Sequence, residues 1–471
     1  MTLPSTPAAV AVPALERPWC AETGATLRLA LPLVGTQLAQ IAIMTTDVLF
    51  MGWLGPEALA AGALGSNVYF LLWVFGIGLG MATSPVIAQA VGAKRKYLRD
   101  SRRTVRQGLW ATLTVAIPGT IAMWHAAPLL RLLGQDPAIA EYAQEYTRAL
   151  APGLLPAIWF IVLRNFIAAF ERPRSGLVVQ ILTFFINAGL AYALIFGKAG
   201  APAFGLTGAG VASAIAHWAS VAMLLGFILV DRRFRRFHLL GRFWRPDIRR
   251  YLEIWRVGLP ISATLLFEVG LFSGAVYAMG IIGTAELAAH QIALQCAAVT
   301  FMVPLGIGQA ATVRVGLFKG AGEREGVRRA GWTALGLGIG FMAAMMIVMW
   351  ILSDDLAHLF LDVRQPGSPR VAEIAESFLI VAAVWQVMDG AQAVALGVLR
   401  GLKDTRVPMI IAGFGYWAVG AVAGVYMGFD LGGWGLGLGG LGIWYGLVVG
   451  LFMVSVLATW RWIRRERLGL V

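Results

Sequence analysis

Charged side chains are scarce in this sequence of 471 residues. Asp, Glu, Lys and Arg together make up 13% of it, whereas hydrophobic residues make up 58%. Soluble domains carry about 25% charged residues and about 45–50% apolar ones. The composition therefore excludes a water-soluble globular enzyme and a disordered chain, and it indicates a protein whose solvent is mostly lipid.

Cysteine and the common catalytic motifs are also lacking. The only two cysteines, Cys20 and Cys296, lie far apart, which excludes a disulfide framework and a paired-cysteine zinc site. No GxxxxGKS/T loop and no HExxH motif is present, so neither ATP hydrolysis nor zinc chemistry is supported. We expect no enzyme activity and no cofactor. Residues 1–24 lack a charged stretch before an apolar core, which predicts an N-terminal tail rather than a cleavable signal peptide.

Long apolar runs, by contrast, recur along the whole chain. About 20 apolar residues are enough for a helix to cross a bilayer, and the sequence contains twelve such runs. They cover residues 25–51, 58–90, 107–130, 142–168, 177–197, 208–230, 256–281, 287–316, 330–352, 371–399, 408–427 and 441–463. We therefore predict an all-α polytopic membrane protein with twelve transmembrane helices.

The positive residues are concentrated in alternate connections between these runs. Those after the even-numbered runs are rich in Lys and Arg, above all 94–106 and 231–250. The odd-numbered connections hold only Arg131, Lys198, Arg364 and Arg370. Cytoplasmic loops are the ones that carry excess Lys and Arg, so both termini are predicted to be cytoplasmic. The net charge of +13 then needs no nucleic-acid partner, and we expect none.

The second half of the chain repeats the first at an offset of 228 residues. Leu31-Pro32 aligns with Leu259-Pro260, Leu59-Ala60-Ala61 with Leu287-Ala288-Ala289, and Gly78, Gly80 and Gly92 with Gly306, Gly308 and Gly320. This predicts two pseudo-symmetric six-helix lobes, at 25–230 and 256–463, joined by a cytoplasmic linker at 231–255 and followed by a tail at 464–471. Two parallel repeats around a central site suit alternating access.

Among the acidic residues inside predicted spans, three are candidates for a function within the membrane. Asp47, Glu268 and Asp389 have no Lys or Arg within four positions, so no local ion pair neutralises them. Ionisable groups in the membrane are costly and are functional candidates by default. A buried carboxyl can hold a proton, and its oxygens can also ligate a small cation. Glu268 and Asp389 thus suit H⁺ or Na⁺ coupling, and Asp47 suits coupling or binding of a cationic substrate. A protonated carboxyl bonded to a neighbouring helix is the alternative.

Polar and aromatic residues accompany these acids. Gln37 and Gln40 lie on roughly the same helical side as Asp47, and Gln40 aligns with Glu268 in the repeat. Asn187 and Gln291 add amides to other spans. Tyr69, Phe267, Phe272 and Trp385 offer aromatic faces that suit lipophilic cations, although packing against lipid would also explain them. Arg164 lies near the predicted cytoplasmic end of its span, where we expect its guanidinium to reach water.

These motifs together resemble the multidrug and toxic compound extrusion (MATE) transporters. The resemblance lies in Leu31-Pro32, Gln40, Asp47, Gly52-Trp-Leu-Gly55 and Leu59-Ala60-Ala61 of the first half. In the second half, Phe267-Glu268-Val269, Ala288 to Leu294, Met388 to Gln392 and Leu399 to Thr405 are similar to the NorM-type bacterial branch. The similarity covers almost the whole chain.

The resemblance implies a V-shaped pair of lobes in a bacterial inner membrane. It also implies a monomer, in contact with lipid, that exports cationic amphipathic compounds in exchange for H⁺ or Na⁺. The cation site falls on the residues matching Glu268 and Asp389, with Gln291 at an associated position, and the residue matching Asp47 acts in the N-terminal lobe. Two departures remove oxygen ligands: Trp385 replaces a common Tyr, and Ala191 replaces an Asn four residues after Asn187. Both make Na⁺ less suited than H⁺.

Two other functions fit parts of the sequence. A lipid-linked saccharide flippase of the wider superfamily would share the architecture, but such proteins tend to have a more cationic central cavity than these acids predict. A membrane receptor or channel is disfavoured by the internal duplication and by the lack of a ligand-binding domain.

Overall fold

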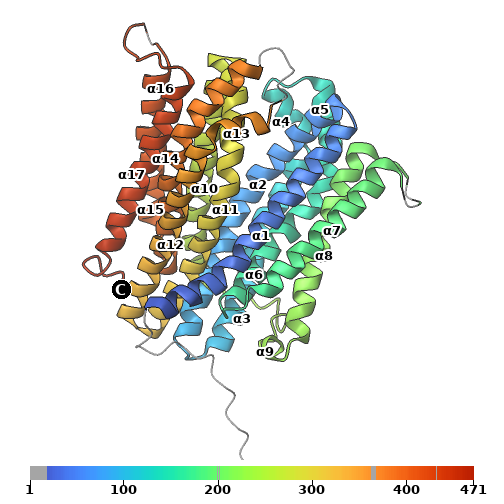
Figure 1. Cartoon of the computed structure of the whole chain (residues 1–471). Helices are drawn as coiled ribbons and strands as arrows, with labels where there is room; N and C mark the ends of the chain where they lie inside the picture. Colours follow the sequence, from blue (N-terminus) through green and yellow to red (C-terminus); the bar gives the residue numbers. More distant parts are fainter. Residues whose placement is uncertain (1–18, 199, 201, 362–367, 431) are drawn as a thin grey trace, which may run out of the picture.

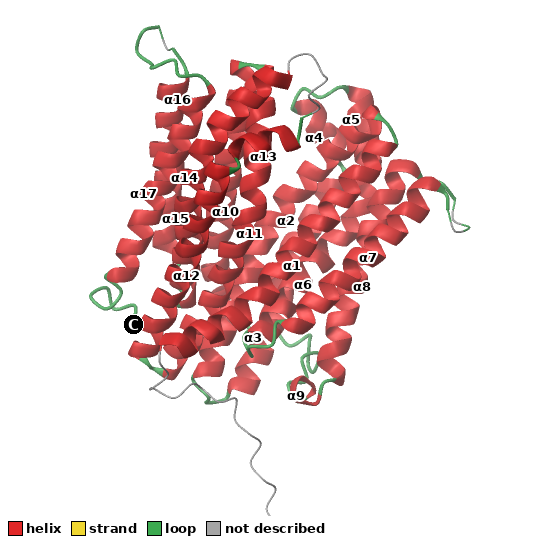
Figure 2. Cartoon of the chain, viewed as in Figure 1, coloured by secondary structure: helices red, strands yellow, loops and turns green. Residues whose placement is uncertain are grey.

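The structure is a computed structural model that describes residues 19–198, 200, 202–361, 368–430 and 432–471. All the regular secondary structure of these residues is helical (Figure 2), so the predicted all-α fold class is confirmed. Residues 1–18 of the predicted N-terminal tail and Arg364 lie outside the described residues.

The first half of the chain forms a bundle of mostly long helices (Figure 1). These are α1 (Trp19–Trp53), α2 (Pro56–Gly92), α3 (Tyr97–Trp124), α4 (Ala126–Leu132), α5 (Pro137–Leu150), α6 (Leu154–Ala168), α7 (Arg174–Phe196) and α8 (Gly205–Val230). A 3₁₀ turn, η1 (Ala151–Gly153), joins α5 to α6, and the short α9 (Arg232–Arg235) lies in the linker. The apolar side chains between α2, α5, α6 and α8 form the core of this half.

The second half repeats this arrangement. Its helices are α10 (Ile248–Ile282), α11 (Thr284–Ala321), α12 (Arg324–Ile351), α13 (Ser353–Leu359), α14 (Ser368–Gly401), α15 (Arg406–Gly413), α16 (Val422–Gly428) and α17 (Gly440–Ile463). A π-helical segment, η2 (Phe414–Ala421), continues α15 into α16. By length and composition, 11 helices of the described residues can cross a membrane, or up to 12 with the bent pair α3–α4.

Two details of the predicted spans are wrong. The predicted span 107–130 is interrupted at His125, where α3 and α4 meet at 70°. The helix predicted to begin at residue 256 begins at Ile248, because the side chain of Asp247 caps its first turn by accepting a hydrogen bond from the Arg250 backbone N–H at 3.3 Å. The first two turns of α10 therefore occupy part of the predicted linker.

The two halves meet through pairs of glycines related by the 228-residue repeat. The Cα of Gly78 on α2 packs against Ser262 on α10, and that of Gly306 on α11 packs against Val34 on α1. The second contact is the repeat counterpart of the first, since 78 pairs with 306 and 34 with 262. A Cβ at either glycine would collide with the facing helix. Small residues thus let the halves approach closely, as is common between membrane helices.

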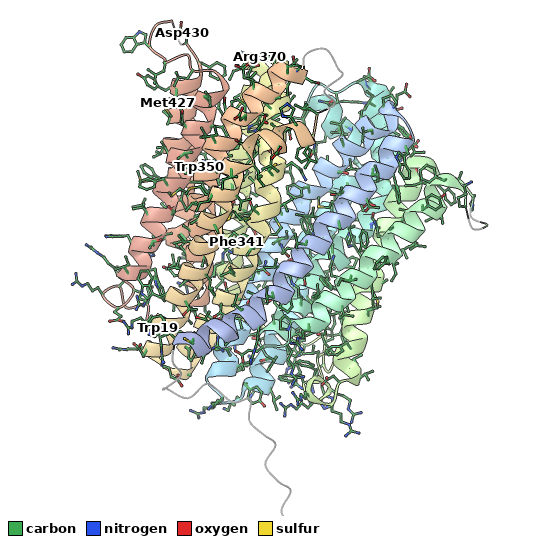
Figure 3. The ribbon with its side chains drawn as sticks, viewed as in Figure 1. Trp19, Phe341, Trp350, Arg370, Met427 and Asp430 are labelled. Carbon is green, nitrogen blue, oxygen red and sulfur yellow. The ribbon has the colours of Figure 1, made fainter. Side chains whose placement is uncertain are left out.

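The contacts between halves are concentrated at one end of the bundle. Trp19 and the C-terminus lie at this end, which we call the terminal end, whereas Arg370 and Asp430 lie at the other (Figures 1 and 3). There Gly92 packs against the Leu317 backbone, and its counterpart Gly320 packs against the Gln89 backbone. The Gln89 side-chain amide also donates to the Gly401 carbonyl at 2.8 Å. The halves are therefore fastened where α2, α11 and α14 end.

Candidate functional site

The N-terminal half holds a buried carboxyl bound by neutral donors. Asp47 lies on α1 and is 9% exposed. Its Oδ1 accepts a hydrogen bond from Asn187 Nδ2 on α7 at 2.7 Å, and its Oδ2 accepts one from Ser213 Oγ on α8 at 3.0 Å. Among the described residues it forms no ion pair. The structure thus brings the predicted residues Asp47 and Asn187 together and adds Ser213, which the sequence reasoning missed.

Other predicted residues of this half lie in separate contacts. The Tyr69 hydroxyl lies 3.3 Å from His217 Nε2, and the two rings stack. Gln40 Oε1 accepts from Gln180 Nε2 at 2.9 Å. Neither Tyr69 nor Gln40 hydrogen-bonds to Asp47 among the described contacts. Tyr69 and Gln40 therefore provide aromatic and polar groups on α2 and α1, but they are not direct hydrogen-bond partners of the Asp47 carboxyl.

The C-terminal half holds a chain of polar groups around Asp389. This residue lies on α14, is 2% exposed, and accepts a hydrogen bond at Oδ1 from Gln392 Nε2 at 3.3 Å. Gln392 Oε1 in turn accepts from the Tyr416 hydroxyl at 2.7 Å. Tyr416 lies in the π-helical η2, and such segments are frequent at functional sites. The Tyr416 hydroxyl is therefore linked to Asp389 only through Gln392.

Glu268 lies close to this chain without bonding to it. It is half-buried on α10, and its charge interacts with those of Asp389 and Arg400. Among the described residues none donates a hydrogen bond to its carboxyl. The structure therefore brings the predicted pair Glu268 and Asp389 into one neighbourhood, with one carboxyl anchored and the other free of hydrogen-bond partners.

The remaining predicted residues divide into core and surface. Trp385 is 3% exposed and packs edge-on against Phe272 and Trp444 at centroid distances of 5.7 Å, so it lies in the core rather than facing an open cavity. Phe267 packs beside Gly413 of α15. Gln291 is exposed on α11 and makes no hydrogen bond with Glu268 or Asp389 in the described structure.

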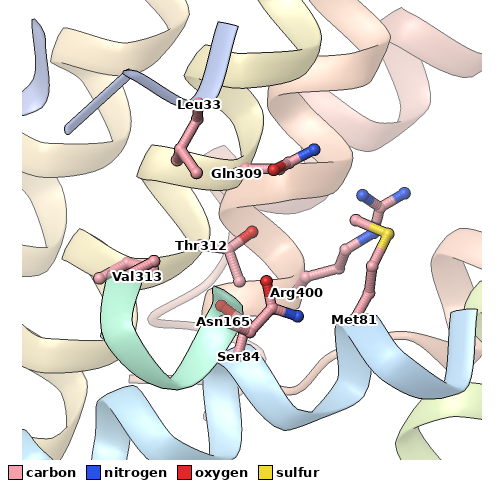
Figure 4. A pocket seen from close by; sticks show the side chains of 9 residues that line it. Leu33, Met81, Ser84, Asn165, Gln309, Thr312, Val313 and Arg400 are labelled. Carbon is pink, nitrogen blue, oxygen red and sulfur yellow. The ribbon is translucent and has the colours of Figure 1, made fainter. Parts of the chain in front are cut away.

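Arg164 does not reach water, contrary to the expectation from its position. It is 6% exposed on α6 and donates to Gln37 Oε1 at 3.0 Å and to Gln309 Oε1 on α11 at 3.3 Å. Neighbouring residues of both halves enclose a cavity of about 10 Å³, which has room for about one water (Figure 4). Its lining includes Ser84, Asn165, Gln309 and Arg400. The bond from Arg164 to Gln309 thus joins the two halves, whereas Gln37 bonds to Arg164 within the N-terminal half.

A buried ion triad joins the halves nearer the terminal end. Arg314 on α11 is 1% exposed and pairs with both oxygens of Glu22 on α1, at 2.8 and 2.5 Å, and with Glu171. The sequence reasoning assigned Glu22 to the tail and did not consider Arg314. The signal was present, because Arg314 lies inside the predicted span 287–316, where a charge is unusual.

One protein family matches two segments of the chain, one in each half. The model of the MatE family matches residues 32–193 and 260–426, and the two matches begin 228 residues apart. The chain belongs to the MatE family. This is a family of multidrug efflux transporters, as the NorM resemblance implied.

Individual relatives of this MatE chain agree. The "Probable multidrug resistance protein NorM" of Mesorhizobium japonicum is 48% identical over 454 residues, covering 96% of each chain. A solved structure described as the outward-facing conformation of a multidrug resistance MATE transporter gives a TM-score of 0.84 at 22% identity, covering 95% of this chain and 96% of that one. A Pyrococcus furiosus transporter, titled for the reverse polarity of its binding pocket, gives 0.83 at 21%, covering 95% and 97%. At these identities the two structures show the fold alone.

Proposed function

We propose that this MatE chain is a secondary antiporter that exports cationic, amphipathic compounds in exchange for inward H⁺ or Na⁺. The observation that carries the proposal is a carboxyl site within the helices of each half. Asp47 and Asp389 are buried, and neither they nor Glu268 form an ion pair in the described structure. Uncompensated carboxyls inside a membrane protein are costly and are retained where ions or substrates pass.

The packing of the halves supports an arrangement closed to the cytoplasm. The Arg-rich connections lie at the terminal end, which supports a cytoplasmic location for that end. The glycine contacts, the Gln89 hydrogen bond and the Arg314 triad all fasten the halves in that part of the bundle. Farther along α11, Gln291 and Gln295 are exposed. Amides facing lipid are unfavourable, so these two support a water-lined space on the outer side.

The two carboxyl sites have different hydrogen-bond partners, which supports different roles. Two neutral donors hold Asp47, and hydrogen bonds of this kind stabilise the charged form of a carboxyl and so suit attraction of an organic cation. Glu268 and Asp389 share one neighbourhood, where the addition of a cation relieves like-charge repulsion. Cation entry from outside at this pair would favour substrate release and the return to the inward-facing state.

The contacts of Asp389 support H⁺ rather than Na⁺ as the coupling ion. A hard cation needs several oxygen ligands, yet Gln392 turns an N–H toward Asp389 and its own oxygen toward Tyr416. Trp385, which lies one helical turn before Asp389, presents no oxygen. A proton needs only the carboxyl itself.

Transport in proteoliposomes tests the proposal. The purified full chain would be reconstituted and ethidium flux measured under a pH gradient and, separately, a sodium gradient. We expect flux driven by the pH gradient, and a loss of about tenfold or more in Glu268→Gln and Asp389→Asn. The matched control is Glu373→Gln, an exposed carboxyl on the same helix as Asp389. Undiminished coupled flux in both site variants would contradict the proposal.

A flippase for anionic, lipid-linked substrates is the second candidate, because Arg164 and Arg400 lie between the halves. Reverse pocket polarity is also the feature named for the Pyrococcus furiosus structure. Two observations weigh against it: both terminal nitrogens of Arg164 donate to glutamines, and Arg400 faces the charge of Glu268. Flipping of a fluorescent polyprenyl diphosphate, unaffected by Glu268→Gln but lost in Arg400→Gln, would favour the flippase.

A further inference from the structure

A pocket at the terminal end lies outside both carboxyl sites. It has a volume of about 280 Å³ and lies between the start of α3 and the linker that precedes α10. Six arginines line it: Arg99, Arg102, Arg103, Arg106, Arg242 and Arg245. The two groups of arginines come from segments more than a hundred residues apart in sequence, so the fold, and not a local charge run, brings them together. Nothing in the proposed transport cycle uses this pocket.

The α3 side chains hold the linker in place around the pocket. Arg106 Nη1 donates to the Arg242 carbonyl at 2.8 Å, and Trp110 Nε1 donates to the Phe243 carbonyl at 3.2 Å. Arg103 Nε donates to Asp247 Oδ2 at 2.5 Å. These contacts fix the backbone of the linker, so the pocket is a built feature of the fold and not a chance approach of two mobile loops.

The positive charge of the pocket is only partly matched. Asp247 is the single acidic residue of the lining, against six arginines. Burial alone would raise the pKa of Asp247, but the hydrogen bond from Arg103, with help from the Arg250 backbone and both positive charges, holds the pKa below its usual value. Arg106 is only 5% exposed, and its Nε and that of Arg102 are buried without a hydrogen-bond partner. Buried donors of this kind require an acceptor.

We propose that this basic pocket binds the phosphate group of an anionic phospholipid headgroup. Guanidinium groups bind phosphate oxygens in a bidentate manner, and six of them line this pocket. The volume is just below that of sites for drug-sized ligands, about 300 Å³ and more. It therefore has room for a phosphate that carries a small alcohol.

The rim of the pocket favours a lipid over a soluble phosphate. Trp244 is 78% exposed and lies edge-on to Trp110 at 5.8 Å, and Ile248, four residues later, is 69% exposed. Exposed tryptophans mark the headgroup level of a membrane. Basic pockets between membrane helices on the cytoplasmic side suit acidic headgroups. A headgroup in the pocket would therefore place its acyl chains against this apolar rim.

Native mass spectrometry of the delipidated full chain tests the site. The probes are phosphatidylglycerol and phosphatidylcholine with identical acyl chains. The double variant Arg102→Gln/Arg245→Gln removes two pocket charges while keeping the three contacts that hold the linker. The matched control, Arg232→Gln/Arg235→Gln, removes two exposed charges of the same linker. We expect phosphatidylglycerol to bind the wild type and the control about tenfold more tightly than the pocket variant, with little change for phosphatidylcholine.

Competition with soluble anions is the second part of the test. Inorganic phosphate and glycerol phosphate, added in excess, should displace the lipid only weakly, and Trp244→Ala should weaken lipid binding. The proposal is overturned if the two lipids bind alike, if the control loses as much affinity as the pocket variant, or if inorganic phosphate fills the site as well as the lipid does. Because the readout is binding, the result is independent of whether the chain is an antiporter.

Discussion

Single side chains decide how each carboxyl of this MatE chain behaves. Asp47 is held at both oxygens, Asp389 at one, and Glu268 at neither, within the described structure. A carboxyl with fewer hydrogen-bond donors gains more from taking up a proton or another cation. The three acids therefore differ in the number of hydrogen bonds that hold them, which supports different roles for them in the proposed exchange.

Tyr416→Phe tests the polar chain around Asp389. The substitution deletes the hydroxyl that donates to Gln392 Oε1 at 2.7 Å and keeps the ring in place. We expect a stability loss of about 1 kcal/mol, measured as a lowered midpoint of thermal unfolding in detergent. Since Gln392 loses its anchor, the pH profile of coupled flux should also shift. Tyr445→Phe, which alters a tyrosine 42% exposed on α17, is the control. An unchanged pH profile would mean that Tyr416 plays only a structural part.

Asp47→Asn tests the opposite carboxyl. An amide keeps the size of the side chain, but it cannot carry charge, and one of its two terminal atoms cannot accept the bonds from Asn187 and Ser213. We expect the affinity for ethidium to fall about tenfold or more, measured by fluorescence binding. Ser213→Ala removes one of the two donors, so its affinity for ethidium should lie between that of Asp47→Asn and that of the wild type. An Asp47→Asn variant with wild-type affinity would exclude this residue from substrate binding.

The sequence revealed the acids and one partner, Asn187, but not the others. Asp47, Glu268 and Asp389 were predictable because a charge in an apolar span is conspicuous on its own. Ser213 and Tyr416 were not, because serine and tyrosine are common in membrane helices and become informative only when another helix is placed beside them. Arg164 was misjudged for the same reason: its partner Gln309 lies 145 positions away, and no local pattern predicts that contact.

The two halves pack through pairs of helices. Among the described contacts that join the halves, the Arg314 triad is the strongest electrostatic one. Losing one member of a buried ion pair costs about 3–5 kcal/mol. Arg314→Gln should therefore loosen α1 from α11 and shift the protein toward the inward-facing state. The shift can be measured as the rate at which a thiol introduced by Ser84→Cys is labelled. Ser84 is 7% exposed and lines the small cavity. The reagent is a maleimide that cannot cross the membrane, applied to inverted vesicles. The background carries Cys20→Ser and Cys296→Ser.

The labelling experiment has a clear contrast. The thiol introduced by Ser84→Cys should react slowly in the parent and several-fold faster when Arg314 is replaced. Arg328→Gln, which breaks an exposed pair with Glu325, should leave the rate unchanged, since exposed pairs contribute about 0–1 kcal/mol. Equal labelling of parent and Arg314→Gln would show that the triad does not hold the halves together at the terminal end.

Helix boundaries were largely predictable, because the spans are long and apolar. The bend at His125 and the π-helical η2 were not, since neither leaves a periodic signal in the sequence. In η2 the reason is packing: Gly415 and Gly420 bring its backbone against Val454 and Gly450 of α17. The extra residue in the turn is compatible with that close contact, and it places Tyr416 where its hydroxyl meets Gln392.

At the scale of the whole molecule, the repeat explains how one interface can close. The contacts of Gly78 with Ser262 and of Gly306 with Val34 are counterparts under one offset. The ionisable groups do not obey this symmetry: Asp47 aligns with Ala275, and Asp389 aligns with Ile161. The frame on which the halves move is therefore duplicated, whereas the chemistry of each half is its own. That combination is consistent with the proposed exchange of two different cations.

The orientation of the whole chain is the last prediction. Trp19 and the C-terminus lie at the end where the Arg-rich connections gather, so this end should face the cytoplasm. A green fluorescent protein fused after Val471 folds only in the cytoplasm and should fluoresce. Alkaline phosphatase inserted after Lys198, in the connection between α7 and α8, is active only outside and should be active. The reciprocal insertions, phosphatase after Val471 and fluorescent protein after Lys198, should both be silent. The reverse pattern would move the basic pocket and the Arg314 triad to the outer face, and the arrangement described here would then be open to the cytoplasm.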